Sequence, residues 1–127
     1  MNCLKLSVSA ALIFLFLLLP MFLVAQFDRQ DTLRGSVTPE RAWWDLTYYH
    51  LDIEVDPAER TIEGRNTVQY RVLEPGKRMQ VDLQPPMALR GAVQNGQPLE
   101  YNRDGNVYYI QMPQSLKAGQ VYELELE

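Results

Sequence analysis

The strongest constraint on the fold is the alternation of apolar and polar residues along two neighbouring segments. In the first, Leu51, Ile53 and Val55 are separated by acidic residues, and in the second the even-numbered positions from 62 to 72 are mostly apolar while the odd-numbered ones are polar. A period of two places successive side chains on opposite faces of a β-strand. Residues 56–60 include a proline and predict a turn. We therefore predict an antiparallel hairpin with one solvated face, whose register is well specified because a one-residue slip would expose the whole apolar set.

Further short strands are expected along the rest of the chain. The candidate segments are 79–83, 89–94, 99–103, 107–112 and 122–126. Asn95-Gly96 and Asp104-Gly105 favour the positive φ angles of type I′ hairpin turns. Helical periodicity is almost absent, apart from one helix start at Thr38. These patterns predict an all-β protein, either an antiparallel sandwich or a partly open barrel.

The N-terminal 25 residues are of a different kind. Twenty of them are apolar, and Lys5 precedes an apolar run that ends at Ala25. This is the pattern of a secretory signal peptide cleaved before Gln26, although the run also approaches the length of an uncleaved membrane anchor. We expect an exported protein, periplasmic or extracellular, which the leader would tether to the membrane if it stayed uncleaved.

The expected organisation has three parts. Residues 1–25 are the signal peptide, 26–42 an extended lead-in with a short helical turn, and 43–127 a β-sandwich domain. The final alternating run reaches Glu127 without a following turn, and such a run would leave an open sheet edge. For this reason we expect the chain to be the first part of a longer protein, with the sandwich incomplete at its C-terminal end.

Composition excludes several classes of function. The 12 Lys and Arg residues are outnumbered by 16 Asp and Glu, and the arginines are dispersed among acids, which argues against a nucleic-acid binder. There is one histidine, His50, and one cysteine, Cys3, which lies in the leader. Catalytic zinc needs three protein ligands, commonly two of them histidines, so no metal site is expected. A serine nucleophile would have to be Ser36 or Ser115, and neither stands in a nucleophile-elbow motif.

The acidic residues of the first predicted strand also have a simple explanation. Asp52, Glu54 and Asp56 lie on one face of the strand together with His50, with alternate residues spaced along it at roughly 6.6 to 7 Å. Calcium ligands must converge from a turning loop, so we interpret this row as a solvated face. No catalytic, metal-binding or substrate-binding residue is predicted in this chain.

The densest aromatic group is the one candidate for a binding surface. It comprises Trp43, Trp44, Tyr48 and Tyr49. Three interpretations remain open: a platform on which a ligand such as a sugar stacks, a surface that packs against a neighbouring domain, or a plug in the sandwich core.

Several segments together resemble the start of an exported bacterial zinc aminopeptidase of the aminopeptidase N family, which belongs to the gluzincin metallopeptidases. They are residues 31–35 (DTLRG), 38–55 (TPERAWWDLTYYHLDIEV), 61–70 (TIEGRNTVQY), 81–83 (VDL) and 93–96 (VQNG). The resemblance implies a saddle-like N-terminal β-sandwich that packs against a downstream catalytic domain of the same polypeptide. It also implies zinc and peptide substrates in the full-length protein. The family's zinc helix and substrate loop have no counterpart here, so no activity is expected of this chain alone.

Two hypotheses of function follow. In the first, the chain is the signal peptide and non-catalytic N-terminal sandwich of a zinc aminopeptidase that removes N-terminal residues from peptides. In the second, it is a stand-alone exported β-sandwich module that binds a carbohydrate or a protein, because a fold does not determine a function. A native protein much longer than 127 residues would favour the first hypothesis.

Overall fold

The computed structural model describes residues 28–127, and the predicted signal peptide lies outside the described residues. Strands dominate this part of the chain, and two short helices precede them. The helices are α2 (Arg29–Gly35) and α3 (Pro39–Ala42). The strands are β1 (Trp44–Asp56), β2 (Thr61–Val72), β3 (Arg78–Asp82), β4 (Ala92–Gln94), β5 (Gln97–Pro98), β6 (Tyr101–Asp104), β7 (Val107–Gln111) and β8 (Val121–Leu126).

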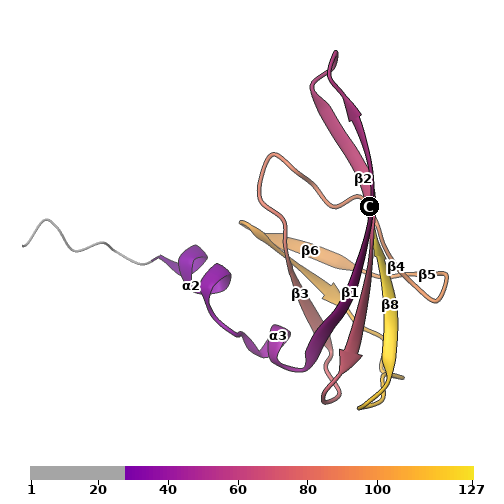
Figure 1. Cartoon of the computed structure of the whole chain (residues 1–127). Helices are drawn as coiled ribbons and strands as arrows, with labels where there is room; N and C mark the ends of the chain where they lie inside the picture. The colour runs from indigo at the N-terminus through magenta and orange to yellow at the C-terminus, as the bar shows by residue number, and fades with distance from the viewer. Residues whose placement is uncertain (1–27) are drawn as a thin grey trace, which may run out of the picture.

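The strands form two antiparallel sheets. One has the order β1-β2-β8-β4-β5 and the other β3-β7-β6 (Figure 1). The predicted all-β class and antiparallel sandwich are therefore confirmed. Strands β1 and β3 are terminal strands of their sheets.

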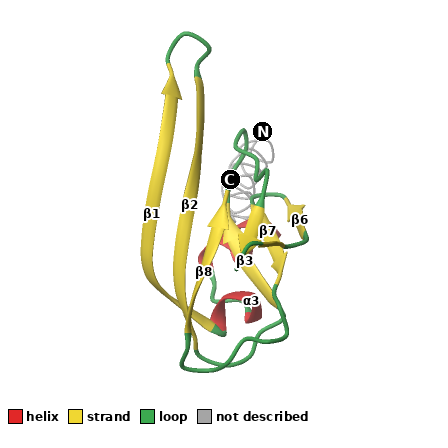
Figure 2. Ribbon diagram, turned by 90° about the vertical axis from the view of Figure 1, so that its right-hand side faces the viewer, coloured by secondary structure: helices red, strands yellow, loops and turns green. Residues whose placement is uncertain are grey.

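The β1–β2 hairpin is the longest feature of the sandwich. Its register runs from Trp44 opposite Val72 to Asp56 opposite Thr61. Strand β8 pairs only with the half of β2 from Asn66 to Arg71. The other half of the hairpin consequently projects beyond the rest of its sheet, as Figure 2 shows.

A β-bulge lies near the start of β1. Leu46 is opposite Tyr70 and Tyr48 is opposite Gln69, so Thr47 is the extra residue. The Thr47 hydroxyl donates to the Gln69 carbonyl oxygen at 3.0 Å. An extra residue reverses the alternation of faces along the strand. Even-numbered residues before the bulge and odd-numbered residues after it therefore face the same side.

The two predicted hairpin turns differ in type. Asn95 and Gly96 have φ angles of 52° and 74°, as a type I′ turn requires, so this prediction is confirmed. The hairpin predicted at Asp104-Gly105 is confirmed as well, but its turn is not the type I′ turn expected from these two residues. Asp104 is paired opposite Val107 at the end of the ladder, and of the two residues between them only Gly105 has a positive φ, at 59°. That combination is typical of a type II′ turn.

The segment 26–42, expected to be extended apart from one helical turn, contains two helices in its described part. The expected turn is present as α3, with Pro39 at its start. The preceding helix, α2, was missed. Asp28 caps it, since its carboxylate accepts from the Asp31 backbone N–H and the Asp31 carboxylate accepts from the Asp28 N–H. A reciprocal capping box of this kind satisfies two helix-terminal N–H groups, and Leu33 is buried against Val107 and Tyr109.

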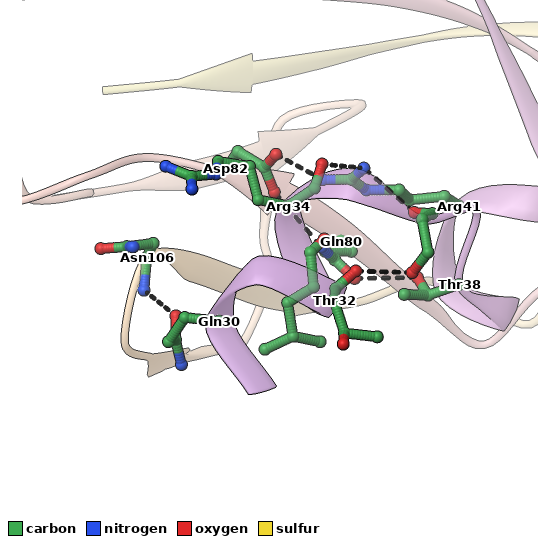
Figure 3. A network of polar contacts seen from close by, with 10 residues as sticks. Gln30, Thr32, Arg34, Thr38, Arg41, Gln80, Asp82 and Asn106 are labelled. Atoms are coloured by element: carbon green, nitrogen blue, oxygen red, sulfur yellow. Dashed lines mark hydrogen bonds and ion pairs between the residues drawn. The ribbon is translucent and has the colours of Figure 1, made fainter. Parts of the chain in front are cut away.

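A polar network fastens these helices to the three-stranded sheet (Figure 3). The Gln80 amide donates to the Leu33 carbonyl oxygen at 2.9 Å and accepts from the Thr38 hydroxyl at 2.8 Å. Arg41 forms an ion pair with Asp82. Because Gln80 is buried, these bonds compensate for the loss of its contact with water.

The main core lies between the two sheets. Its fully buried members include Tyr70 and Val72 from β2, Met79 from β3, Ile110 from β7 and Leu124 from β8. Alternate residues of these strands point inward, as the period of two predicts. This core holds in place the half of the β1–β2 hairpin that pairs with β8.

Candidate functional site

The four aromatic residues of the sequence-predicted surface do not form one cluster. Trp43 is only 3% exposed and belongs to the main core. Its indole N–H donates to the Arg78 carbonyl oxygen at 2.8 Å, and its ring meets Tyr70 edge-on with centroids 5.9 Å apart. Buried tryptophans of this kind stabilise the fold through the large apolar area that they bury and through the hydrogen bond of the indole N–H.

Trp44 packs at the border of the core. It is half-buried, meets Tyr70 edge-on at 6.1 Å, and donates its indole N–H to the Glu40 carbonyl oxygen at 3.1 Å. Tyr70 is fully buried, and its hydroxyl donates to Gln94 Oε1 at 2.7 Å. Burial raises the pKa of Tyr70 well above its ordinary value. For both tryptophans, the core interpretation is the one that matches their contacts.

Tyr48 and Tyr49 are exposed and lie on opposite faces of β1. Tyr49 is opposite Val68, a core residue, whereas Tyr48 is opposite Gln69 on the outer face. Neighbouring residues of a strand point to opposite sides. These tyrosines therefore do not form a shared platform for a ligand.

The structure also corrects the prediction that the hairpin has only one solvated face, because part of its apolar face is exposed. The exposed part covers the projecting half of the hairpin and consists of Leu51, Ile53, Val55 and Ile62, which we call the apolar hairpin face. Each of the four side chains is between 53% and 60% exposed. Val55 is opposite Ile62, and Ile53 is opposite Gly64. The face continues the core-facing side of the sheet, but the described residues include no second sheet against it.

Gly64 is required by the close approach of the two strands. A Cβ at this position would lie 2.4 Å from the Asp52 carbonyl oxygen and 3.1 Å from Ile53 Cα. Backbone atoms cannot move aside as the end of a flexible side chain can. The glycine therefore keeps the hairpin closely paired at the centre of its apolar face.

A groove adjoins the apolar hairpin face at the open side of the sandwich. It has a volume of about 610 Å³ and lies between the start of β1 and strand β3. Its apolar lining includes Trp44, Leu46, Tyr49, Val68, Val81 and Leu126. Trp44 and Leu46 share this side with Tyr49 because the bulge at Thr47 reverses the alternation.

One polar atom in the groove lacks a partner. Asn66 lines the groove, and its Oδ1 atom is buried without a hydrogen bond to the described residues. A buried acceptor without a donor costs about 1–3 kcal/mol. A molecule that entered the groove with an N–H or O–H group at this point would remove that cost.

The opposite face of the hairpin is polar and mostly acidic. Asp52 is opposite Arg65, and Glu54 is opposite Glu63. Arg90 donates to both carboxylate oxygens of Glu63 at 3.2 Å. Like charges directly opposite each other are destabilising, and Arg90 offsets part of this repulsion. The exposed row predicted from the sequence, with His50 at its start, is therefore a solvated face.

The donor set of residues 28–127 does not fit a zinc site. Within this part of the chain, no three side chains of His, Cys, Asp or Glu converge so that they could hold a metal ion. Nor does any helix among the same residues have the length and apolar character needed to cross a membrane.

Comparison with solved structures finds that this fold is similar to part of several M1 zinc metallopeptidases. A two-domain M1 zinc metallopeptidase variant bound to L-arginine has a TM-score of 0.58 and 26% identity, covering 68% of this chain and 20% of its own. An M1 zinc metallopeptidase from Deinococcus radiodurans has the same score and identity over 67% and 20%. A variant from that organism bound to a Tyr-Ser-Ala substrate scores 0.59 at 25% identity over 68% and 20%.

These similarities define the class of protein that the fold resembles. No protein-family model and no curated protein matches the chain. The chain spans about one fifth of the length of the metallopeptidases it is similar to. The likeness to zinc metallopeptidases expected from the sequence is thus supported by structure, for the part of the molecule that the match covers.

Proposed function

We propose that this chain is the non-catalytic N-terminal β-sandwich of an exported zinc aminopeptidase that removes N-terminal residues from peptides. The observation that carries the proposal is the fold match to M1 zinc metallopeptidases at 26% identity over 68% of the chain. The ordered series of segments between 31 and 96 supports the same family independently. One similar enzyme is bound to a Tyr-Ser-Ala substrate, which agrees with peptide substrates.

The residues of this domain act by packing rather than by chemistry. Zinc would be held by the catalytic domain, since the described residues provide no converging set of ligands. We therefore derive no step of peptide hydrolysis from them. The domain partner is the catalytic domain of the same polypeptide, to which the sandwich offers a rigid, strand-built surface.

The proposal is tested on the native protein isolated from its source with an antibody to residues 28–127. We expect a mass several-fold above 14.7 kDa, bound zinc, and cleavage of peptides with a free N-terminus but not of their N-acetylated forms. A chelator should abolish the cleavage, and zinc should restore it. A metal-free native protein of 14.7 kDa or less would contradict the proposal and favour the stand-alone binding module.

Export is tested separately. The leader pattern supports a cleaved signal peptide, so we expect the mature protein outside the cytoplasm with Gln26 as its first residue. Fractionation followed by N-terminal sequencing measures both properties. A native protein that retains Met1 in the membrane fraction would indicate the uncleaved anchor.

A further inference from the structure

We infer that residues 28–42 form a strap that opens as one unit and thereby uncovers the outer face of the three-stranded sheet. The strap comprises α2, α3 and the link between them, and it is held on the sheet mainly by polar contacts, three of which are ion pairs. In Figure 1, α2 lies on the side of β3 that is turned away from β1. The inference concerns the sandwich itself and does not depend on the proposed function.

The face under the strap includes alternate residues of β7. Tyr108 and Ile110 of this strand belong to the main core, whereas Val107 and Tyr109 point to the other side and pack with Leu33 of α2. Val107 is 1% exposed and Tyr109 is 7% exposed. Because they lie outside the main core, these two side chains owe their burial to the strap. An open strap would therefore expose them to solvent.

Charged side chains make most of the contacts between the strap and the sheet. The three ion pairs are Arg29–Asp104, Glu40–Arg78 and Arg41–Asp82. Arg29 donates to both carboxylate oxygens of Asp104, at 2.7 Å for one of them. Leu33 is the one buried side chain of residues 28–42, so apolar burial holds the strap at a single point. Exposed ion pairs add little each, and a segment with few buried apolar contacts opens more easily than the core unfolds.

Gln80 of β3 couples the two halves of the strap (Figure 3). Its buried amide bonds to the Leu33 carbonyl oxygen in α2 and to the Thr38 hydroxyl that precedes α3. Arg41 also donates to the carbonyl oxygens of Arg34 and Ser36, at 3.3 Å in both cases. If either helix left alone, these bonds would break without freeing the other helix. The two helices should therefore open together.

The strap ends where the main core begins. Trp43, the next residue, is a core residue whose carbonyl oxygen accepts from the backbone N–H groups of Leu73 at 2.8 Å and Glu74 at 3.2 Å. None of these contacts involves residues 28–42. The strap can consequently open about Trp43 while the core stays folded.

Thiol labelling of the native protein tests the inference. Val107→Cys places a thiol under the strap, and Val68→Cys places one in the main core, where the valine is 3% exposed. Cys3 is replaced by serine if the leader is retained, and any other cysteine of the native protein likewise. Rates of maleimide labelling are divided by the rates in urea, which removes differences in intrinsic reactivity. We expect the thiol at 107 to label at least about tenfold faster than the thiol at 68, because only the latter requires the core to open. Equal rates would overturn the inference.

The part played by charge is tested in the Val107→Cys protein by neutralising the acids of the three ion pairs, with Glu40→Gln, Asp82→Asn and Asp104→Asn. Each change should accelerate labelling about two- to fivefold. Raising NaCl from 0.01 to 1 M should also accelerate it, because the screening length falls from about 30 to about 3 Å. The matched control neutralises three exposed acids outside the strap and its contacts, with Glu59→Gln, Glu74→Gln and Glu100→Gln. An equal effect of the two sets of substitutions, or no effect of the first set, would contradict a strap held by its ion pairs.

Amide hydrogen exchange shows whether the strap opens as a unit, and it does not depend on the cysteine variants. Asp104→Asn removes the ion pair of α2, and Asp82→Asn removes one of the ion pairs of α3. Each change should accelerate exchange of both the Ser36 and the Ala42 N–H groups, which are bonded within the strap, while exchange in β2 stays unchanged. Acceleration confined to the helix that lost its ion pair would refute opening as one unit.

Discussion

Replacing Gly76 with alanine should destabilise the sandwich because the added Cβ would clash with the indole ring of Trp43. A Cβ at position 76 would lie 2.1 Å from Trp43 Cδ2 and 2.3 Å from Cγ. The indole has little freedom to move aside, because its N–H is bonded to the Arg78 carbonyl oxygen and its ring packs edge-on against Tyr70. The new methyl group therefore forces a displacement within a packed core.

The magnitude follows from these contacts. Overpacking a core costs about 1–3 kcal/mol. A displaced indole would lose a hydrogen bond worth about 0.5–1.5 kcal/mol and an aromatic contact worth about 0.5–1.5 kcal/mol. If the indole moves, part of the clash is relieved but the hydrogen bond and the aromatic contact are weakened. The overpacking cost and these losses therefore do not simply add. We expect Gly76→Ala to lower the free energy of unfolding by about 2–4 kcal/mol.

Urea unfolding followed by tryptophan fluorescence measures this change, and Gly35→Ala is the matched control. A Cβ at Gly35, in helix α2, would meet nothing within 4 Å, so that variant should be neutral or more stable by up to about 1 kcal/mol. In a Trp43→Ala background the penalty of Gly76→Ala should largely disappear, since the clashing ring is gone. The reasoning would be refuted if Gly76→Ala lowered the free energy of unfolding by less than about 0.5 kcal/mol in the parent. It would also be refuted if the decrease were just as large in the Trp43→Ala background.

Three further changes test other parts of the structure. Gly64→Ala places a Cβ against a backbone carbonyl oxygen of β1, so amide exchange in the projecting hairpin should accelerate while that of β3 and β7 stays unchanged; equal exchange in the two proteins would contradict the close packing. Tyr70→Phe leaves the buried Gln94 amide without its one partner and should lower the free energy of unfolding in urea by about 1–3 kcal/mol. In the parent, the raised pKa of Tyr70 should delay its ultraviolet titration beyond the ordinary tyrosine pKa of about 10. Arg29 lowers the pKa of Asp104 by a hydrogen bond, so the pair stabilises the fold above the ordinary carboxylate pKa of about 3.9 and this contribution disappears as pH falls through the lowered value. Asp104→Asn should therefore lose less stability than the parent between pH 6 and pH 3, and an unchanged acid dependence would argue against the ion pair.

The hairpin was predictable because its signal is local. Between 51 and 72 the alternation fixes both the strands and the residues that share a face, and the observed register agrees with that pattern. The turn at Asn95-Gly96 was predictable for the same reason, since two neighbouring residues determine it. Helix α2 was missed because its stability depends on a cap at Asp28 and on Leu33 packing against residues more than 70 positions away.

The aromatic surface was harder to predict because it depends on which face of the strand the even-numbered and odd-numbered residues occupy. The sequence analysis grouped Trp43, Trp44, Tyr48 and Tyr49 by proximity along the chain. The bulge at Thr47 divides the group, because it places Trp44 on the same side as Tyr49 although their spacing is odd, and leaves Tyr48 on the opposite side. A signal was present, since apolar residues occupy positions 44 and 46 and then 49, 51 and 53. Such a change of phase within one strand indicates a bulge.

The distribution of charge on the hairpin distinguishes its two faces on physical grounds. Proteins usually protect a terminal strand with lysine, proline or inward-pointing charges, because an open edge invites pairing with other chains. Strand β1 has none of these over its 13 residues, and its acids all occupy the face away from the apolar hairpin face. On the acidic face, Glu54 lies directly opposite Glu63. Such a pairing lowers stability unless a cation such as Arg90 offsets the repulsion. Concentrating charge on one side while leaving four apolar side chains on the other favours a hairpin that is solvated on its acidic face and covered on its apolar one.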